Sequence, residues 1–359
     1  MIRYLGQEEK EKSKELWRQA FPEESEAYTE FYYRQAVRDN QILAEEEGGR
    51  VISMLHRNPY RMQIRDTVWP VCYIVGVATR QDHRRRGLMR NLMVRCLQDL
   101  HKEEIPMAYL MPADRAYYTP FAFTDITYHD FYRGNPEDAG EYMTADSMAP
   151  EETAEYCNRI LACWYEAYTL WDASYCVRRR QELKSEGGDM GFLCQAGKRR
   201  GVISYVPDGD GYEIQEILRE PSFAARAPEE IFERKHTVPI MGRVTHGKRF
   251  MKLLRSDRDI ELTIYLEDSL IPGNTGLYHL HVGRDACQAV RLPKEELISA
   301  ESAGGECIWV SSQGLTSLLF GQTGLGRLME EGHVRGGAAA AESLAHLRPV
   351  SGVCIMEII

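Results

Sequence analysis

Thirteen residues, Val77-Ala-Thr-Arg-Gln-Asp-His-Arg-Arg-Arg-Gly-Leu-Met89, join an apolar run at 71–75 to a pattern of apolar residues over 88–100. The run predicts a strand, and the spacing that follows predicts an amphipathic helix. The first N–H groups of a helix have no acceptor within it, and the helix dipole adds partial positive charge there. We therefore expect this turn to bind a pyrophosphate through backbone amides and arginines. The alternative is an exposed basic turn of an ordinary strand–helix unit.

The composition places the chain among ordinary globular proteins. With 359 residues, 43% hydrophobic and 27% charged, it predicts two or three domains. A formal charge of −10 argues against nucleic-acid binding and favours a cationic small molecule or a basic peptide as partner. The nine cysteines are scattered without a Cys-x-x-Cys pair, which predicts reduced core residues in a cytoplasmic protein. A signal peptide and long apolar spans are absent from the sequence, so no membrane association is expected.

Strand and helix signals mix along the chain, which predicts an α+β fold. Residues 1–135 read as one mixed α/β domain with a hairpin at Glu47-Gly-Gly-Arg50. The polar stretch at 134–152 predicts a linker, and 136–238 repeats the order of helix, hairpin and strand more weakly. Residues 239–359 form a third unit, whose apolar end predicts a buried C-terminus.

Two other basic runs test how specific the first one is. Arg178-Arg-Arg180 falls in a helical pattern that covers 152–180, and Lys198-Arg-Arg-Gly201 falls in a hairpin with no helix after it. Neither run can collect the free amides of a helix start. We interpret both as solvated faces.

The motif Arg84-Arg-Arg-Gly-Leu-Met89 resembles the Gln/Arg-x-x-Gly-x-Gly/Ala pyrophosphate loop of the GNAT acetyltransferases, with Met89 in the last small-residue place. The run from Val75 to Phe123, including Tyr118-Thr-Pro-Phe-Ala-Phe123, resembles the Eis family more specifically. Ile240-Met-Gly-Arg-Val and the Met-Glu-Ile-Ile ending extend the resemblance. It implies tandem GNAT-like mixed α/β domains, the second degenerate, followed by a sterol-carrier-protein-like domain. It also implies acetyl-CoA as co-substrate and a homo-oligomer, with a hexamer as one form.

The resemblance also implies two catalytic groups. Acetyl transfer to an amine needs a neutral amine and a proton for the departing thiolate. The family places the acid at Tyr118 and the proton acceptor at the C-terminal carboxylate, here on Ile359. The alternatives are a tyrosine of an aromatic cluster and an edge strand that ends by chance at an apolar residue.

The remaining site predictions concern the co-substrate and the acceptor. Backbone N–H groups around the strand end are expected to bind the thioester carbonyl, and the loop to bind the pyrophosphate; the residues are Val77, Ala78, Thr79, Arg84, Arg85, Arg86, Gly87, Leu88 and Met89. Glu24, Phe31 and Tyr32 are candidates for an acceptor cleft, although an ordinary amphipathic helix explains them equally well. His83 is assigned to the loop rather than to proton transfer.

The sequence does not favour a metal site. The histidines form no His-x-x-x-His pair, and His279-Leu-His281 is better explained by packing of a strand. The predicted function is therefore acetyl-CoA-dependent transfer of acetyl to a primary amine by direct attack in a ternary complex, without a metal. Two alternatives remain open, a protein lysine acetyltransferase and a non-catalytic acyl-CoA-sensing carrier of an apolar ligand.

Overall fold

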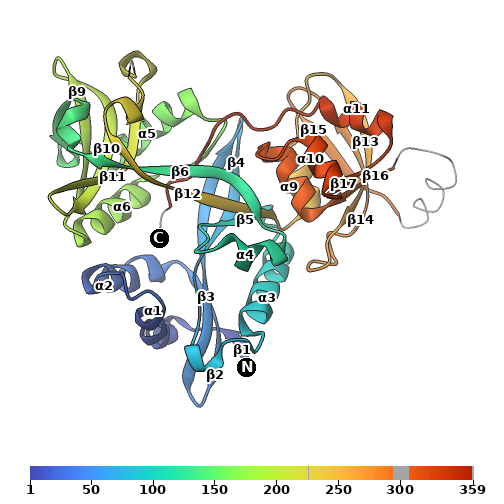
Figure 1. Ribbon diagram of the computed structural model, residues 1–359, viewed down its shortest axis with the longest axis horizontal. Coiled ribbons are helices and arrows are strands. Elements are labelled where there is room, and N and C mark those ends of the chain that lie inside the picture. Colours follow the sequence, from blue (N-terminus) through green and yellow to red (C-terminus); the bar gives the residue numbers. More distant parts are fainter. Residues whose placement is uncertain (225, 294–306, 358–359) are drawn as a thin grey trace.

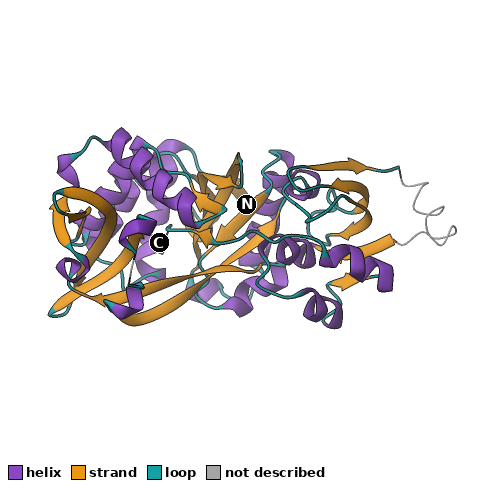
Figure 2. Cartoon of the chain, turned by 90° about the horizontal axis from the view of Figure 1, so that it is seen from above, coloured by secondary structure: helices purple, strands orange, loops and turns teal. Residues whose placement is uncertain are grey.

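The computed structural model describes residues 1–224, 226–293 and 307–357. Figure 1 shows three lobes that meet where two long strands, β6 (Thr124–Gly134) and β12 (Glu233–Val244), cross the middle of the molecule. A 13-stranded sheet runs through the first two lobes, and a five-stranded sheet forms the third. Seen from above, strands continue from lobe to lobe with helices packed against them (Figure 2). The predicted mixed α/β architecture is confirmed.

The first lobe is built on four consecutive antiparallel strands with helices on both faces. Apolar residues of the first two helices pack on one face, and those of the third helix pack on the other. The strands are β1 (Ile2–Tyr4), β2 (Gln41–Glu47), β3 (Arg50–Ile64) and β4 (Thr67–Thr79), and the helices are α1 (Lys14–Ala20), α2 (Glu26–Arg34) and α3 (Leu88–Lys102). β5 (Met107–Leu110) then lies parallel to β4, before α4 (Arg115–Tyr118) and a 3₁₀ turn at Thr119–Phe121.

The second lobe repeats this order of elements. Its four sheet strands lie in sequence order from the outer edge inward, as β1 to β4 do. They are β7 (Glu141–Thr144), β9 (Asp189–Gln195), β10 (Lys198–Asp208) and β11 (Gly211–Arg219), with helices α5 (Pro150–Trp164) and α6 (Ala173–Ser185).

Two sequence predictions for this lobe are wrong. The expected linker at 134–152 contains β7, a short and mostly exposed edge strand whose polar residues resemble a loop. The helical pattern over 152–180 is interrupted by β8 (Ala167–Thr169), which leaves the lobe to pair with β3 and with the C-terminal strand β18 (Val353–Cys354). Both strands are defined by distant partners, which local periodicity does not reveal.

The prediction of a solvated face for Arg178–Arg180 is also wrong. Arg179 is 4% exposed, and its guanidinium pairs with Glu182 at 2.8 Å and with Glu216 at 3.0 Å. Arg180 pairs with Asp146 and Asp189, and Arg178 lies over the ring of Tyr60. α6 buries charged residues because the sheet beneath it carries complementary carboxylates.

The third lobe begins after β12, which runs through residue 238 without a break and lies between β5 and β6 of the large sheet. The sequence did not reveal this strand, because its first residues are charged and exposed. The smaller sheet has the order β15-β14-β13-β16-β17. Its strands are β13 (Ile260–Glu267), β14 (Gly276–Val282), β15 (Cys287–Arg291), β16 (Cys307–Ser311) and β17 (Val334–Arg335); its helices are α7 (Gly247–Met251), α9 (Ser312–Phe320), α10 (Leu325–Glu330) and α11 (Ala338–Ala345).

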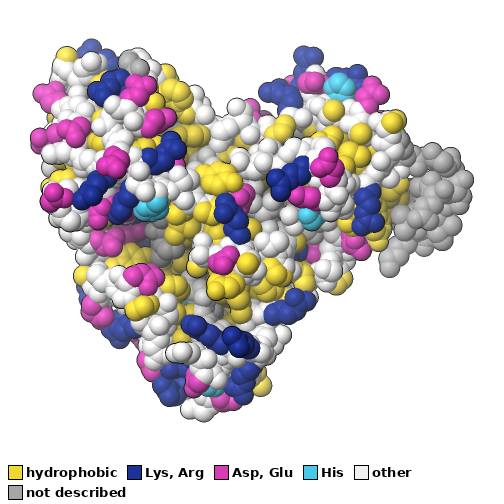
Figure 3. All heavy atoms as spheres, in the orientation of Figure 1, with side chains coloured by type: hydrophobic (Ala, Val, Ile, Leu, Met, Phe, Trp, Pro, Cys, Tyr) yellow, Lys and Arg dark blue, Asp and Glu magenta, His cyan; other side chains and the backbone are white. Residues whose placement is uncertain are grey.

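Two general features agree with the composition. Seven of the nine cysteines are buried as free thiols within the apolar clusters, as expected; they are Cys72, Cys96, Cys157, Cys176, Cys194, Cys287 and Cys354. Acidic and basic side chains are interspersed over the visible face of the molecule (Figure 3). Among the described residues, no helix has the length and apolar character needed to cross a membrane.

Candidate functional site

The large sheet opens between β4 and β5. The two strands pair in parallel at Cys72–Ala108 and Tyr73–Tyr109, after which β5 ends at Leu110 while β4 continues to Thr79. In this part of the described structure, the end of β4 faces no strand on its β5 side. A ligand can therefore meet main-chain groups of β4 directly at this opening.

A β-bulge lies on β4 at the same place. Val75 pairs with His56 and Ala78 with Met54, so that Gly76 and Val77 together face Leu55. Gly76 has a φ of 61°, and a Cβ at this position would lie 2.5 Å from Cζ3 of Trp17. Glycine is required here, both for the left-handed backbone and for the close approach of the indole. The bulge redirects the amides around Val77, which the sequence analysis had selected for the thioester carbonyl.

The basic loop that follows β4 ends at the start of α3. Gly87 is the residue before the helix, with a φ of 79°, and Arg85 also has a positive φ of 63°. Residues 84–87 are exposed, and Arg84 donates from Nε to the carbonyl of Thr79 at 3.3 Å. The opening turn of a 15-residue helix is thus accessible to an anion and surrounded by arginines. Met89 is half-buried against the cluster that covers this face of the sheet.

His83 lies at the edge of this loop. Its ring contacts Asp82 and Glu47, each at 2.8 Å, and Asp82 and then Glu47 raise its pKa. A histidine held between two exposed carboxylates is stabilised as a cation. This environment does not favour proton abstraction.

Tyr118 comes from the turn that follows β5. Its side chain is 7% exposed and belongs to the same apolar cluster as Ile74 of β4 and Leu110 of β5. Burial raises the pKa of its phenol to about 12. Tyr117 points outward and is 58% exposed. Of the two tyrosines, only Tyr118 lies against the strands that flank the opening.

The predicted acceptor residues do not lie together at a surface. Tyr32 is fully buried, stacks on Trp17 with ring centroids 4.3 Å apart, and places its hydroxyl 3.0 Å from Nδ1 of His56. Phe31 is 8% exposed in the same core. The prediction that both residues line a cleft is wrong, because α2 turns its aromatic face onto the sheet. Glu24 is partly exposed, accepts from Nε1 of Trp17 at 2.6 Å, and has a pKa raised to about 7 by burial.

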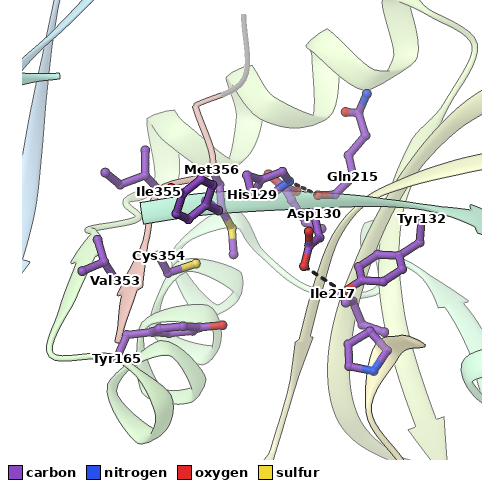
Figure 4. A pocket seen from close by; sticks show the side chains of 13 residues that line it. His129, Asp130, Tyr132, Tyr165, Gln215, Ile217, Val353, Cys354, Ile355 and Met356 are labelled. Atoms are coloured by element: carbon purple, nitrogen blue, oxygen red, sulfur yellow. Dashed lines mark hydrogen bonds between the residues drawn. The ribbon is translucent and has the colours of Figure 1, made fainter. Parts of the chain in front are cut away.

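The C-terminal segment returns to the centre of the molecule. β18 pairs in parallel with β8, and Thr127 of β6 donates to the carbonyl of Val353 at 3.0 Å. Figure 4 shows Val353 to Met356 passing beneath β6, along a cavity of about 200 Å³ that Tyr165 and His129 also line. The expectation of a buried tail is confirmed for the described part, since Ile355 is 2% exposed. Ile359, the predicted proton acceptor, lies outside the described residues.

Glu357 is a residue that the sequence analysis did not select. It is 4% exposed, and its Oε2 accepts from Tyr109 at 3.0 Å and from Thr169 at 2.7 Å. Its Oε1 is buried without a hydrogen-bond partner in the part of the chain that the structure describes. Burial raises the pKa of this carboxyl. The one signal in the sequence is an acidic residue inside an apolar ending.

Aromatic rings continue from Glu357 toward the opening of the sheet. Tyr109 stacks on Tyr73 of β4 with ring centroids 5.1 Å apart, and Tyr60 lies 6.3 Å from Tyr73. Tyr175 of α6 lies 6.2 Å from Tyr60. The tail, β5 and α6 therefore meet next to the residues where the pairing of β4 and β5 ends.

The comparisons with known proteins agree with this geometry. The model of the acetyltransferase (GNAT) domain matches residues 1–125, which include the opening, the loop and Tyr118. Residues 1–125 are therefore a GNAT acetyltransferase domain, and the chain is an acyltransferase of the GNAT type. The model of the sterol carrier protein domain matches residues 248–353, so the GNAT enzyme carries this domain at its C-terminal end. GNAT enzymes use an acyl-CoA co-substrate and act on amines.

Several solved structures share the whole fold of this GNAT chain. A probable N-acyltransferase from Enterococcus faecalis V583 is 15% identical, with a TM-score of 0.79 over 99% of this chain and 98% of that one. A GCN5-related N-acetyltransferase from Kribbella flavida is 15% identical, with a TM-score of 0.78 over 100% and 98% of the two chains. Eis1 from Mycobacterium abscessus is 13% identical, with a TM-score of 0.72 over 99% of each chain. No curated protein matches the chain in sequence.

Proposed function

We propose that this GNAT chain transfers acetyl from acetyl-CoA to a primary amine by direct attack in a ternary complex. The observation that carries the proposal is the position of a buried phenol, Tyr118, beside an opening of the sheet that leads to a glycine-initiated helix. In this proposal residues 1–135 hold the co-substrate, 136–238 form a degenerate second GNAT-like unit, and 239–359 supply the sterol-carrier-protein-like unit and the catalytic C-terminus.

The co-substrate is held by main-chain groups and by charge. Amides at the start of α3 near Gly87 bind the pyrophosphate, and Arg84, Arg85 and Arg86 neutralise it. Amides around Val77 at the bulge bind the thioester carbonyl and stabilise the oxyanion that forms on it. Acetyl-CoA thus enters on the face of α3 and places its thioester at the opening.

The reaction moves two protons. The amine nitrogen attacks the carbonyl carbon, the oxyanion collapses, and the C–S bond breaks with its electron pair on sulfur. Tyr118 then donates its phenolic proton to the departing thiolate. The terminal carboxylate of Ile359 takes the proton that the attacking nitrogen must lose. A group buried among apolar residues is a stronger base than a solvated carboxylate, because burial raises its pKa.

The acceptor amine is proposed to approach from the side of the tail. Among the described residues, Oε1 of Glu357 is buried without a hydrogen-bond partner. Tyr109 donates to the other oxygen of this carboxyl, and Tyr60 is near enough to interact with its charge. A carboxylate and aromatic faces together favour a cationic amine over a neutral one. Small molecules and lysine side chains both carry this group. We further propose that the enzyme is a cytoplasmic homo-oligomer.

The test is release of free thiol from acetyl-CoA as a panel of amines is added. We expect Tyr118→Phe to lower kcat about 100-fold, because a general acid contributes about that factor or more. Tyr117→Phe serves as the matched control and should change kcat less than about twofold. Calorimetric titration with acetyl-CoA should give the same affinity for both variants and the wild type.

Two results would contradict this function. An unchanged kcat in Tyr118→Phe would exclude the phenol as acid, and loss of acetyl-CoA binding in that variant would mean that the residue acts on the co-substrate instead.

Removal of Ile359 tests the proposed base in the same assay. We expect kcat to fall, and the loss to be largest near neutral pH, because the amine is then mostly protonated.

A further inference from the structure

The turn that carries Tyr118 has little to hold it in place by itself. α4 is four residues long, and the 3₁₀ turn after it ends at Ala122, which has a φ of 61°. Within the turn, the amide of Ala122 donates to the carbonyl of Thr119 at 2.9 Å, and that of Phe123 donates to Tyr118 at 3.4 Å. A helix of one turn is not stable without tertiary contacts. The position of Tyr118 therefore depends on what binds this turn from outside.

Arg243 of β12 is one such contact. Its side chain is fully buried, and Nη1 donates to the carbonyl of Phe121 at 2.7 Å. Its Nη2 donates to Oδ1 of Asp268 at 2.6 Å, and its Nε to the carbonyl of Val244 at 3.2 Å. One guanidinium thus ties the Tyr118 turn to β12 and to the third lobe. A buried charge of this kind is stable only while its partners stay in place.

Asp268 lies at the start of a loop of the third lobe, directly after β13. Its Oδ1 also accepts from the amides of Leu270 at 3.1 Å and Ile271 at 3.0 Å, and its Oδ2 accepts from Asn274 at 3.0 Å. The carboxylate is therefore held rigidly by its own loop. The Arg243 guanidinium keeps the pKa of Asp268 below its usual range in spite of burial.

The same loop packs against the face of the sheet that Tyr118 covers. Leu270 and Ile271 belong to one apolar cluster with Tyr118, Phe121 and residues of α3. Gln98 of α3 donates to the carbonyl of Leu270 at 3.1 Å. A segment of the sterol-carrier-protein domain is thus part of the wall around the phenol.

We propose that Arg243 and Asp268 are positioning residues, through which the sterol-carrier-protein domain holds the Tyr118 turn in register with the thioester. This proposal rests on the proposed role of Tyr118 as general acid and extends it to a function for the third lobe. Neither residue is expected to contact acetyl-CoA or the amine. Their effect is to fix the carbonyl of Phe121, and with it the turn that begins at Tyr118.

The expected size of the effect follows from the geometry of proton transfer. A displacement of about 1 Å at a reacting group can cost about 100-fold in rate, and loss of one contact to the turn allows part of that displacement. Acetyl-CoA binding depends on the loop near Gly87, which Arg243 does not contact. We therefore expect kcat to fall while the affinity for acetyl-CoA stays the same.

The test variant is Arg243→Met combined with Asp268→Asn. It leaves no buried charge unpaired, since the asparagine still accepts from the loop amides and the methionine fills the space of the arginine stem. We expect kcat to fall about tenfold, with KM for acetyl-CoA and for the amine within about twofold of wild type. Arg243→Lys keeps the charge but not the fork of two bonds, and should lower kcat by a smaller factor; it decides the question if the double variant does not fold.

A matched control exists at the same interface. Arg65 of the β3–β4 turn donates to the third-lobe carbonyls of Leu253 at 2.5 Å and Arg348 at 2.6 Å, and makes no contact with the Tyr118 turn. Arg65→Met should leave kcat within about twofold of wild type. An equal loss of kcat in this variant would overturn the proposal, because docking of the lobe in general would then explain the result.

Combination with Tyr118→Phe separates this inference from the proposed function. If Arg243 and Asp268 act through the phenol, their substitution should lower kcat less than about twofold in the Tyr118→Phe background. A full tenfold loss in that background would overturn the inference and leave the acid role intact. Full activity of Tyr118→Phe alone would instead refute the acid role on which the inference rests.

Discussion

The two four-stranded units of the large sheet have the same arrangement of strands and helices, but they differ in what surrounds the fourth strand. β1 to β4 and the strands β7, β9, β10 and β11 are arranged in the same order, each with two helices inserted after the first strand. The fourth strand carries a bulge in both units, at Gly76–Val77 in β4 and at Gln215 in β11. The shared plan extends to this local distortion, at which we propose that the first unit binds the thioester.

The surroundings of the two bulges are different. At the second bulge, His129 of β6 contacts the carbonyl of Gln215 through Nε2 at 2.7 Å, and the tail from Val353 to Met356 lines the adjacent cavity. β11 is followed by 3₁₀ turns and β12, while β4 is followed by a long helix with an exposed first turn. The second bulge is thus covered by other segments of the chain, whereas the first lies at the opening where we propose that acetyl-CoA binds. Only the first bulge therefore has the uncovered position that the proposed binding of the thioester needs.

The largest effect is expected from a side chain added at the first bulge. Gly76→Ala places a methyl group 2.5 Å from the ring of Trp17 and requires an alanine with positive φ. We expect the free energy of unfolding to fall by about 3 kcal/mol, from backbone strain of about 1 kcal/mol and overpacking of about 2 kcal/mol. Urea denaturation at neutral pH measures it.

The control for this substitution is Gly197→Ala in the β9–β10 turn. Gly197 also has a positive φ, of 70°, but a Cβ there meets no atom within 4 Å. Gly197→Ala should lower the free energy of unfolding by only about 1 kcal/mol, which is the cost of the backbone strain. Equal losses at the two glycines would mean that the close contact with Trp17 does not constrain the first bulge.

A second prediction concerns the histidine beneath the first bulge. His56 is fully buried, and burial lowers its pKa to about 3. Below about pH 6.5 an unfolded histidine takes up a proton that the folded one does not, so this group favours unfolding increasingly as the pH falls toward 3. We expect it to remove about 1.4 kcal/mol of stability for each pH unit in that window, or about 2 kcal/mol at pH 5.

The measurement is the difference in unfolding free energy between wild type and His56→Gln, taken at pH 7.5 and at pH 5. Buried carboxyl groups with raised pKa values, such as Glu24 and Glu182, stabilise the folded chain as the pH falls. Their contribution is the same in both proteins and therefore cancels in the difference. The stability advantage of the wild type should shrink by about 2 kcal/mol at the lower pH. A constant difference would show that His56 is protonated in the folded chain.

The comparison also explains which features the sequence could reveal. The hairpin at 47–50 and the loop before α3 were predictable, because glycine, charge and periodicity act within a few residues. β8 and β12 were not, because they are strands only through partners far away in the chain, β18 in the first case and β5 and β6 in the second. Their own residues give no strong alternating pattern.

The candidate site divides in the same way. The proposed cofactor loop is continuous in sequence, whereas the proposed acceptor side is assembled from several segments. Tyr32 was assigned to a cleft because aromatic rings can bind a cationic amine, although an amphipathic helix explained the residue equally well. Its stacking on Trp17 and its contact with His56 of β3 place it in the core. Glu357 is a candidate because Tyr109 and Thr169, which come from distant segments, donate to its carboxylate. Residues whose role depends on tertiary contacts cannot be found from one segment.

The smallest expected effect compares two exposed cations beside glycine turns, Arg84 in the first unit and Lys198 in the second. Arg84→Ala removes one charged contact to the pyrophosphate and should weaken acetyl-CoA binding about tenfold, since a charged hydrogen bond contributes about 1.5 kcal/mol. Lys198→Ala should leave binding unchanged, because its turn leads into a strand and not into a helix.

Calorimetric titration of the two variants with acetyl-CoA, at low salt and at 0.5 M salt, measures both affinities. The difference in affinity should narrow at high salt, because salt screens the phosphates. If Lys198→Ala weakened binding as much as Arg84→Ala, general surface charge would be attracting acetyl-CoA, and the helix start near Gly87 would have no special role.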